Sequence, residues 1–360
     1  MKKQNFDLAW EYSESGGGML AALSGAQWQP VSLPHDAAIH KPRSQNAPSG
    51  SLAGHAWSGI VSYRKRFQAP EEWRDQHVQV EFEGIFMNAE VSINANLVAL
   101  HPYGYTSFVI DLTPYLKYGA ENELSVVVNN SAQPNARWYS GTGIYRHAWL
   151  RTGPAPYIKP WGVFVTTPVA DRAASTIKVA TEIFGSVPGA VLRSTILDAG
   201  GTALAEVETP VAGAVAGNTT AVQQTLVVKD AWLWSVEAPN LYTLVSEVCV
   251  DGSGSGSVSS SGSSSCRVVD SEKTTFGIRK VEVDALNGLR LNGAPLKLKG
   301  GCVHHDNGIL GAASYDRAEE RKVELLKASG YNAVRCAHNP PAPAFLDACD
   351  RLGMLVMDES

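Results

Sequence analysis

The stretch Gly330–Glu359, GYNAVRCAHNPPAPAFLDACDRLGMLVMDE, carries the clearest signal for the fold. Two short apolar runs, at 332–334 and 354–357, flank a segment with helical character from about Pro343 to Leu352. A glycine precedes the first run and another follows the helical segment, where a helix should end and a strand begin. The order predicts a strand, a helix and a second strand, which is the repeating unit of a parallel sheet.

Polar side chains follow both predicted strands. Arg335 and His338 come after the first strand, and Asp358 and Glu359 come after the second. Ligands of α/β proteins bind at the carboxyl ends of parallel strands. An Arg-x-x-His pair there can place a guanidinium fork and an imidazole over sugar hydroxyls. On the residues alone, an arginine that pairs with a carboxylate and a surface histidine are equally good interpretations.

The preceding segment has the same alternating organisation. After Asp284, a hairpin and a buried strand at Leu296–Lys299 are expected, followed by an amphipathic helix over Tyr315–Ser329. Asp316 is the expected N-cap of this helix, with Glu319 three residues later. The series of strands and helices predicts the start of a (β/α) barrel, truncated because a full barrel needs roughly 250 residues.

The first part of the chain has a period near two. The runs HVQVEFEGI, AEVSINANLVAL, SFVIDL and NELSVVVNN lie between Trp28 and Leu150, with turns at Asn94–Asn96 and Tyr118–Gly119. Alternation of this kind is typical of strands that bury one face in an antiparallel sandwich. We therefore expect a β-sandwich domain over residues 1–153.

A second set of strands occupies residues 154–283. Its seven β-prone runs have the spacing of an immunoglobulin-like sandwich. Gly252–Ser265 is almost wholly serine and glycine, so we expect a flexible hairpin loop inserted in this domain. The remaining residues, 284–360, form the expected start of the barrel.

Composition excludes several classes of function. A net charge of −5 and a pI near 6.0 provide no basic surface for nucleic acid. There is no run of 18 apolar residues that would indicate a membrane span, and no apolar region behind the first two lysines that would indicate a signal peptide. A cytoplasmic protein is expected, with a trimmed form of an exported protein as the alternative. The nine Trp and twelve Tyr residues suit either sandwich cores or sugar-facing surfaces.

The five cysteines are odd in number and lack C-x-x-C spacing, so neither a disulfide framework nor a zinc site is expected. The sequence contains no G-x-G-x-x-G, G-x-x-x-x-G-K-[ST] or H-E-x-x-H motif. No G-x-S-x-G elbow accompanies the serines and histidines. Nucleotide cofactors, zinc-protease chemistry and a serine triad therefore have no support.

Several segments together resemble glycoside hydrolase family 2, which includes β-galactosidases and β-glucuronidases. They are SLPHDAAI (32–39), RWYSGTGIYRHAWL (137–150), LKLKGGCVHHD (296–306) and the opening stretch. The resemblance implies a mostly β fold: a jelly-roll β-sandwich that binds sugar, an immunoglobulin-like β-sandwich, and the first strands and helices of a (β/α)8 TIM barrel.

The resemblance also implies an activity. Members hydrolyse glycosides by a two-carboxylate double displacement, and the two glutamates lie at the ends of the fourth and seventh barrel strands. This chain does not contain those strands, so no catalytic residue is nominated, and Glu359 is interpreted as structural. We expect the N-terminal part of a retaining β-galactosidase that is inactive alone. A β-glucuronidase, a β-mannosidase and a non-catalytic carbohydrate-binding or assembly module are the alternatives.

By the same resemblance, Arg335 and His338 line the pocket for the terminal sugar. One histidine of His304-His305-Asp306 faces the sugar, with His305 slightly preferred to His304, while Asp306 orients a histidine or touches the sugar. Taken alone, the triplet could also be a set of metal ligands, an interpretation that we disfavour.

The loop before Gly141 is expected to reach this pocket through Asn135, Arg137 and Trp138. Several family members carry an aspartate there that contacts the sugar and a sodium ion, and Asn135 is the nearest substitute. Plain packing is the alternative role for Trp138. No cofactor is expected in this chain. A homo-oligomer is expected in the full-length form, for which the resemblance also allows a metal ion such as magnesium or sodium.

The truncated barrel should leave an unpaired strand edge. The apolar faces of Leu298, Val334 and Val356 are expected to be uncovered. This last segment is therefore predicted to be poorly ordered, aggregation-prone or covered by a partner.

Overall fold

The computed structural model describes residues 1–14, 27–185, 187–211, 217–251 and 266–359. They form two compact units. One contains Gly153–Lys299 together with Met1 and Asp350–Leu355. The other contains Lys2–Thr152, Gly300–Cys349 and the residues from Val356 onward.

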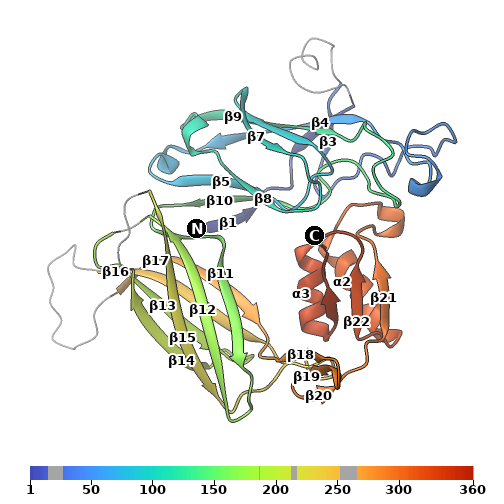
Figure 1. Cartoon of the computed structure of the whole chain (residues 1–360). Helices are drawn as coiled ribbons and strands as arrows, with labels where there is room; N and C mark the ends of the chain where they lie inside the picture. The colour runs from blue at the N-terminus through green and yellow to red at the C-terminus, as the bar shows by residue number, and fades with distance from the viewer. Residues whose placement is uncertain (15–26, 186, 212–216, 252–265, 360) are drawn as a thin grey trace. The chain divides into compact units, whose positions relative to one another are not determined.

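The predicted jelly-roll sandwich is present and has two antiparallel sheets (Figure 1). The first sheet has the order β1 (Lys2–Asn5), β10 (Ala148–Gly153), β5 (His77–Phe82) and β8 (Phe108–Asp111). The second has the order β3 (Gln29–Val31), β2 (Trp10–Ser13), β4 (Ile60–Ala69), β9 (Ala120–Asn129), β6 (Ala89–Ile93) and β7 (Asn96–His101). The four-residue strands β1 and β2 precede Trp28 and were too short to show a period.

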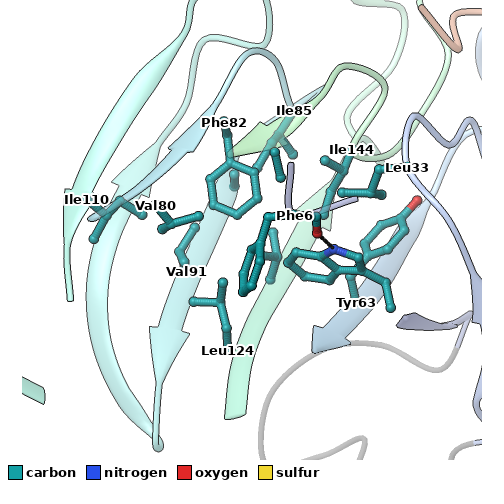
Figure 2. Close-up of a cluster of buried hydrophobic side chains, with 14 of the residues drawn as sticks. Phe6, Leu33, Tyr63, Val80, Phe82, Ile85, Val91, Ile110, Leu124 and Ile144 are labelled. Carbon is teal, nitrogen blue, oxygen red and sulfur yellow. Dashed lines mark hydrogen bonds between the residues drawn. The ribbon is translucent and has the colours of Figure 1, made fainter. Parts of the chain in front are cut away.

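Alternation along the strands builds the sandwich core. In β9, Leu124, Val126 and Val128 are buried while the residues between them are not. They belong to one buried cluster with side chains of the other sheet, among them Val80, Phe82 and Ile110. Figure 2 shows Leu124 together with these three residues. The turn at Asn94–Ala95 has positive φ at both residues, which suits the tight hairpin between β6 and β7.

The second sandwich has the seven predicted strands in an immunoglobulin-like arrangement (Figure 1). A three-stranded sheet contains β11 (Tyr157–Val169), β12 (Ala174–Phe184) and β15 (Thr219–Lys229). A four-stranded sheet has the order β14 (Ala203–Pro210), β13 (Val191–Leu197), β16 (Tyr242–Asp251) and β17 (Cys266–Phe276). Ile177, Leu244 and Phe276 belong to the core between the sheets.

The prediction that the cysteines form no disulfide framework is wrong for one pair. Cys249 and Cys266 form a disulfide with a Cα–Cα distance of 5.5 Å, which is typical of such bonds. Antiparallel pairing of β16 with β17 brings these residues together, and cysteine spacing along the chain does not show strand pairing. The segment Gly252–Ser265, predicted to be a flexible loop, lies outside the described residues.

A small three-stranded antiparallel sheet follows the second sandwich, where a hairpin was predicted. It contains β18 (Val281–Asp284), β19 (Gly288–Leu291) and β20 (Ala294–Pro295). The strand predicted at Leu296–Lys299 is not formed, and Leu298 is 47% exposed. The first parallel strand is instead β21 (Gly300–Val303). It approaches its neighbour so closely that a Cβ on Gly300 would lie 1.8 Å from Ala333 O.

The barrel segment is an open sheet with the order β21, β22 (Ala333–Cys336) and β23 (Leu355–Met357). Strands β21 and β22 are parallel, with Gly300 opposite Ala333 and Val303 opposite Cys336. The helices α2 (Asp316–Ala328) and α3 (Pro343–Leu352) connect the strands. Short 3-10 turns lie at Ser51–Ala53, Glu71–Trp73, Thr113–Tyr115 and Gly308–Leu310. None of the helices in the described part of the chain is long and apolar enough to span a membrane.

Two details of this segment differ from prediction. Tyr315 is the N-cap of α2 and no side chain caps the helix, because the expected capping residues have tertiary partners. Asp316 contacts His147, and Glu319 accepts hydrogen bonds from Ser314 and Asn307. Val334, predicted to be uncovered, is 3% exposed because β22 is the middle strand of the sheet.

Candidate functional site

The polar residues at the strand ends come together as a connected group. Arg335 of β22 donates from Nε to Glu359, the second residue after β23. His338 Nδ1 lies 3.0 Å from the other carboxylate oxygen of Glu359. Parallel strands bring their carboxyl ends to one edge of a sheet, which explains why residues 21 to 24 positions apart in sequence meet here.

Aromatic rings extend this group. The indole of Trp138 stacks on the imidazole of His304 at a centroid distance of 5.5 Å and an interplanar angle of 15°. The ring of His338 lies 5.2 Å from the same indole. The orientation of the Trp138 indole is fixed because its Nε1 donates to the hydroxyl of the buried Tyr105, at 3.0 Å. We call Trp138, His304, Arg335, His338 and Glu359 the strand-end cluster.

Hydrogen bonds indicate the tautomers of the two histidines. His304 Nδ1 lies 2.5 Å from the carbonyl oxygen of Ala337, so this nitrogen must carry the proton and donate. His338 Nδ1 faces the Glu359 carboxylate and donates in the same way. Neither Nε2 atom has a hydrogen-bond partner within the described residues. In its neutral form, each ring therefore keeps one nitrogen that can accept a hydrogen bond from a hydroxyl.

The neighbours of Glu359 favour the ionised form of its carboxyl group. Slight burial raises the pKa of its carboxyl group, but hydrogen bonds from Arg335 and His338 and their charges lower the pKa below its usual range. A general acid in a glycosidase needs a raised pKa. Glu359 is therefore suited to holding Arg335 and His338 in place and unsuited to donating a proton.

Burial distinguishes the two adjacent histidines. His305 is 7% exposed, its Nε2 lies 3.1 Å from Ser140 O, and its ring contacts two buried tyrosines. Burial, followed by the charge of Arg146, lowers the pKa of His305 to about 3, so the ring is neutral. The structure favours the exposed His304 over His305 for contact with a solute. Asp306 is half-buried, and its carboxylate has no hydrogen bond to the described residues.

The three predicted site residues of the loop before Gly141 differ in whether they join the strand-end cluster. Asn135 is exposed, but its amide donates to Asn130 Oδ1 at 2.6 Å, so the side chain turns back onto its own loop. Arg137 is exposed and makes no hydrogen bond or ion pair with the described part of the chain. Only Trp138 of the predicted loop residues joins the strand-end cluster. No three His, Cys, Asp or Glu side chains among the described residues are grouped as metal ligands. The magnesium or sodium ion of a full-length form stays a prediction.

Two buried residues that organise this region were not singled out from the sequence. Asp36 accepts hydrogen bonds from Tyr139 Oη, from Ala312 N at 2.8 Å and from Thr142 N at 3.1 Å. Arg146 donates to Pro340 O at 2.7 Å and to Tyr105 O at 3.0 Å. Both residues lie in segments that carry the family resemblance, SLPHDAAI and RWYSGTGIYRHAWL. That resemblance was the only feature of the sequence that could have pointed to Asp36 and Arg146.

Comparison with known families identifies each part of the chain. Residues 28–154 match the model described as "Glycosyl hydrolases family 2, sugar binding domain", and residues 157–279 match "Glycosyl hydrolases family 2". Residues 281–360 match "Glycosyl hydrolases family 2, TIM barrel domain". The three matches together extend over most of the sequence.

Individual relatives agree with these matches. Beta-galactosidase BoGH2A of Bacteroides ovatus is 40% identical over 366 residues, which cover 100% of this chain and 41% of the relative. A putative beta-glucuronidase of Formosa agariphila is 34% identical over 99% of this chain and 32% of its own length. The crystal structure of a glycosyl hydrolase family 2 member from Bacteroides cellulosilyticus superposes with a TM-score of 0.90 and 38% identity, covering 100% of this chain and 46% of that one. The chain thus spans less than half the length of these relatives.

Proposed function

The chain belongs to glycosyl hydrolase family 2, and we propose that it is the N-terminal part of a retaining exo-β-glycosidase that acts on terminal β-galactosides. The strand-end cluster is the observation that carries this proposal. The choice of galactose is supported by similarity over the whole chain to a relative named as a beta-galactosidase. Glucuronic acid is the second candidate, because another relative with nearly full coverage is named as a putative beta-glucuronidase.

The cluster has the chemistry of a sugar subsite. Trp138 offers an aromatic face, which suits the apolar C–H face of a pyranose. The Nε2 atoms of His304 and His338 can accept hydrogen bonds from hydroxyls, and Arg335 can donate them. Binding of this kind orients the terminal sugar relative to reacting groups, which is a large part of catalysis.

The reacting carboxyl groups belong, in this proposal, to the remainder of the protein. A retaining glycosidase needs two carboxyl groups about 5–5.5 Å apart, one as nucleophile and one as acid/base. Glu359 is engaged by Arg335 and His338 and has a lowered pKa, so it is a positioning residue. The 360-residue chain therefore binds the sugar and does not cleave it.

Calorimetric titration of this chain with two non-hydrolysable ligands tests the proposal. We expect a methyl β-thiogalactoside to bind, and the Arg335→Lys variant to bind it at least tenfold more weakly, because lysine keeps the charge but loses the two-pronged donor. Arg66→Lys is the matched control and should bind normally, because Arg66 is an exposed arginine of the jelly-roll sandwich that also pairs with a glutamate, Glu123. Tighter binding of the corresponding β-thioglucuronide would make the chain glucuronidase-like, and binding of neither ligand would refute the assignment.

Turnover provides a second test. The purified chain should hydrolyse a nitrophenyl β-galactoside no faster than background. Clear turnover would show that the reacting carboxyl groups lie in this sequence. The coding sequence after Ser360 separates enzyme from module: a continuing frame with a strand-end Asn-Glu supports the enzyme, whereas a stop codon supports a non-catalytic binding module.

A further inference from the structure

Trp232, in the second sandwich, is the most exposed large aromatic residue in the described part of the chain. It is 72% exposed, while Ala231 and Trp234 beside it are 2% and 1% exposed. Its backbone is held firmly, because Trp232 N donates to the hydroxyl of Tyr242 at 2.8 Å. The exposed indole is thus presented by an ordered backbone segment between β15 and β16.

Two hollows flank this indole, and Asp230 and Asn240 line both of them. The larger has a volume of about 640 Å³ and extends to Leu204 and to Asp198 in the turn between β13 and β14. The smaller, of about 510 Å³, extends to Arg172. Both volumes fall in the range of small-molecule sites, roughly 300–1,000 Å³.

The rim of the hollows carries unused hydrogen-bonding groups. Asp230, Lys229 and Arg172 are exposed, and their side chains make no hydrogen bond or ion pair within the described residues. Asp230 has φ +51°, a left-handed conformation that aspartate tolerates better than most residues and that suits the turn before Trp232. Asn240 Nδ2 donates to Leu233 O at 3.1 Å, which leaves its amide oxygen as an acceptor.

We infer that this end of the second sandwich is a carbohydrate-binding site for a neutral β-linked oligosaccharide. One pyranose stacks on the indole of Trp232, and its hydroxyls bond to Asp230 and Asn240. Adjacent residues of the oligosaccharide occupy the two hollows on either side. The site would hold a polymeric or branched substrate independently of the strand-end cluster, which lies in the other compact unit.

The polar rim argues against a protein partner as the occupant. A second copy of the chain packed on Trp232 would have to bury the charges of Asp230, Lys229 and Arg172 without partners, which is costly. A sugar instead hydrogen-bonds to such groups and leaves them in contact with water. Aromatic side chains with a few placed polar groups are the usual lining of a small-molecule site.

Indole N–H resonances of the ¹⁵N-labelled chain test this inference. The Trp232 signal is identified by its loss in Trp232→Phe. We expect it to shift on addition of β-1,4-galactotetraose or cellotetraose, up to about 10 mM, tenfold above a dissociation constant of ~1 mM. Asp230→Asn should lower the affinity that the Trp232 signal reports severalfold. Trp232→Ala, which removes this signal, should lower the affinity for the same oligosaccharide in a calorimetric titration at least tenfold. Trp161→Ala is the matched control, because Trp161 is 60% exposed in the same sandwich and lines neither hollow.

Two results would overturn the inference. One is a Trp232 signal that does not move with either oligosaccharide. The other is a Trp232 signal that shifts with protein concentration in the absence of sugar, which would identify the surface as a contact between copies. The Trp138 signal monitors binding at the strand-end cluster, and the Trp232 signal monitors binding at the second sandwich. If the proposed glycosidase function were wrong, the Trp232 signal would still test binding at this second site.

Discussion

The most direct test of the fold around the candidate site is to remove His147. Its Nδ1 lies 2.6 Å from Asp7 Oδ2, and its Nε2 lies 3.0 Å from Asp316 Oδ1 at the start of α2. Because both ring nitrogens face carboxylates, the doubly protonated imidazolium satisfies both contacts. The residue thereby ties the jelly-roll sandwich to the helix that precedes β22.

The size of the effect follows from the pKa. Burial lowers the pKa of His147, but the hydrogen bond to Asp7 and the charges of Asp7, Glu83 and Asp316 outweigh it and raise the pKa from 6.5 to about 9. At about 1.4 kcal/mol per pH unit, this interval corresponds to about 3 kcal/mol of folded-state stability. A raised pKa gives a contribution that is full below pH 6.5 and is lost as the pH rises through 9.

We therefore expect His147→Gln to be less stable than the wild type by up to about 3 kcal/mol at pH 6, with the difference largely gone at pH 10. Urea unfolding of both proteins across this range measures the difference, and the ¹⁵N signals of the imidazole measure the pKa directly. His40→Gln removes an exposed histidine of the same sandwich and serves as the control. An imidazole that titrates between pH 6 and 7, or a stability difference that does not change with pH, would refute the reasoning.

Three further predictions concern packing and the strand edge. Gly311→Ala should destabilise the chain by about 2–4 kcal/mol, because its Cβ would lie 2.3 Å from Asp36 Oδ2 at φ +63°. Gly308→Ala, at φ +60° with open space around it, should have a clearly smaller effect on the melting temperature. Replacing Cys249 and Cys266 by serine should lower stability by about 3 kcal/mol, from the loop closed by residues 17 apart. An equal loss in a reduced wild-type sample is expected, and unchanged urea midpoints would contradict the bond. Amides of Leu355–Met357 should exchange rapidly because β23 is an edge strand, so strong protection in a monomer would count against this.

Local patterns were sufficient wherever neighbouring residues decide the structure. The helix predicted from Pro343 to about Leu352 is α3, and the alternating runs of both sandwiches are strands. The prediction failed where a distant partner intervenes. The first parallel strand is β21 rather than Leu296–Lys299, and it begins at Gly300, where the absence of a side chain allows close approach to β22.

In the candidate site, too, some features follow from the local sequence and others depend on distant partners. Arg335 and Glu359 were expected at one sheet edge because parallel strands must end together, and the structure joins them directly. The order of His304 and His305 could not be read from adjacent identical residues, since only burial beneath the sandwich loop separates their roles. Arg146 was missed because its partner, Pro340 O, is 194 residues away.

The sequence by itself determined the family, the order of the three folds and the polar residues at the strand ends, because each depends on local periodicity or on a contiguous motif. Only the tertiary structure decided which of those residues meet. It selected Trp138 and His304 for the cluster, turned Asn135 away, paired Cys249 with Cys266 and left Trp232 exposed. The physical reason is that burial, ring stacking and hydrogen-bond partners arise between segments far apart in the chain, and no local pattern records them.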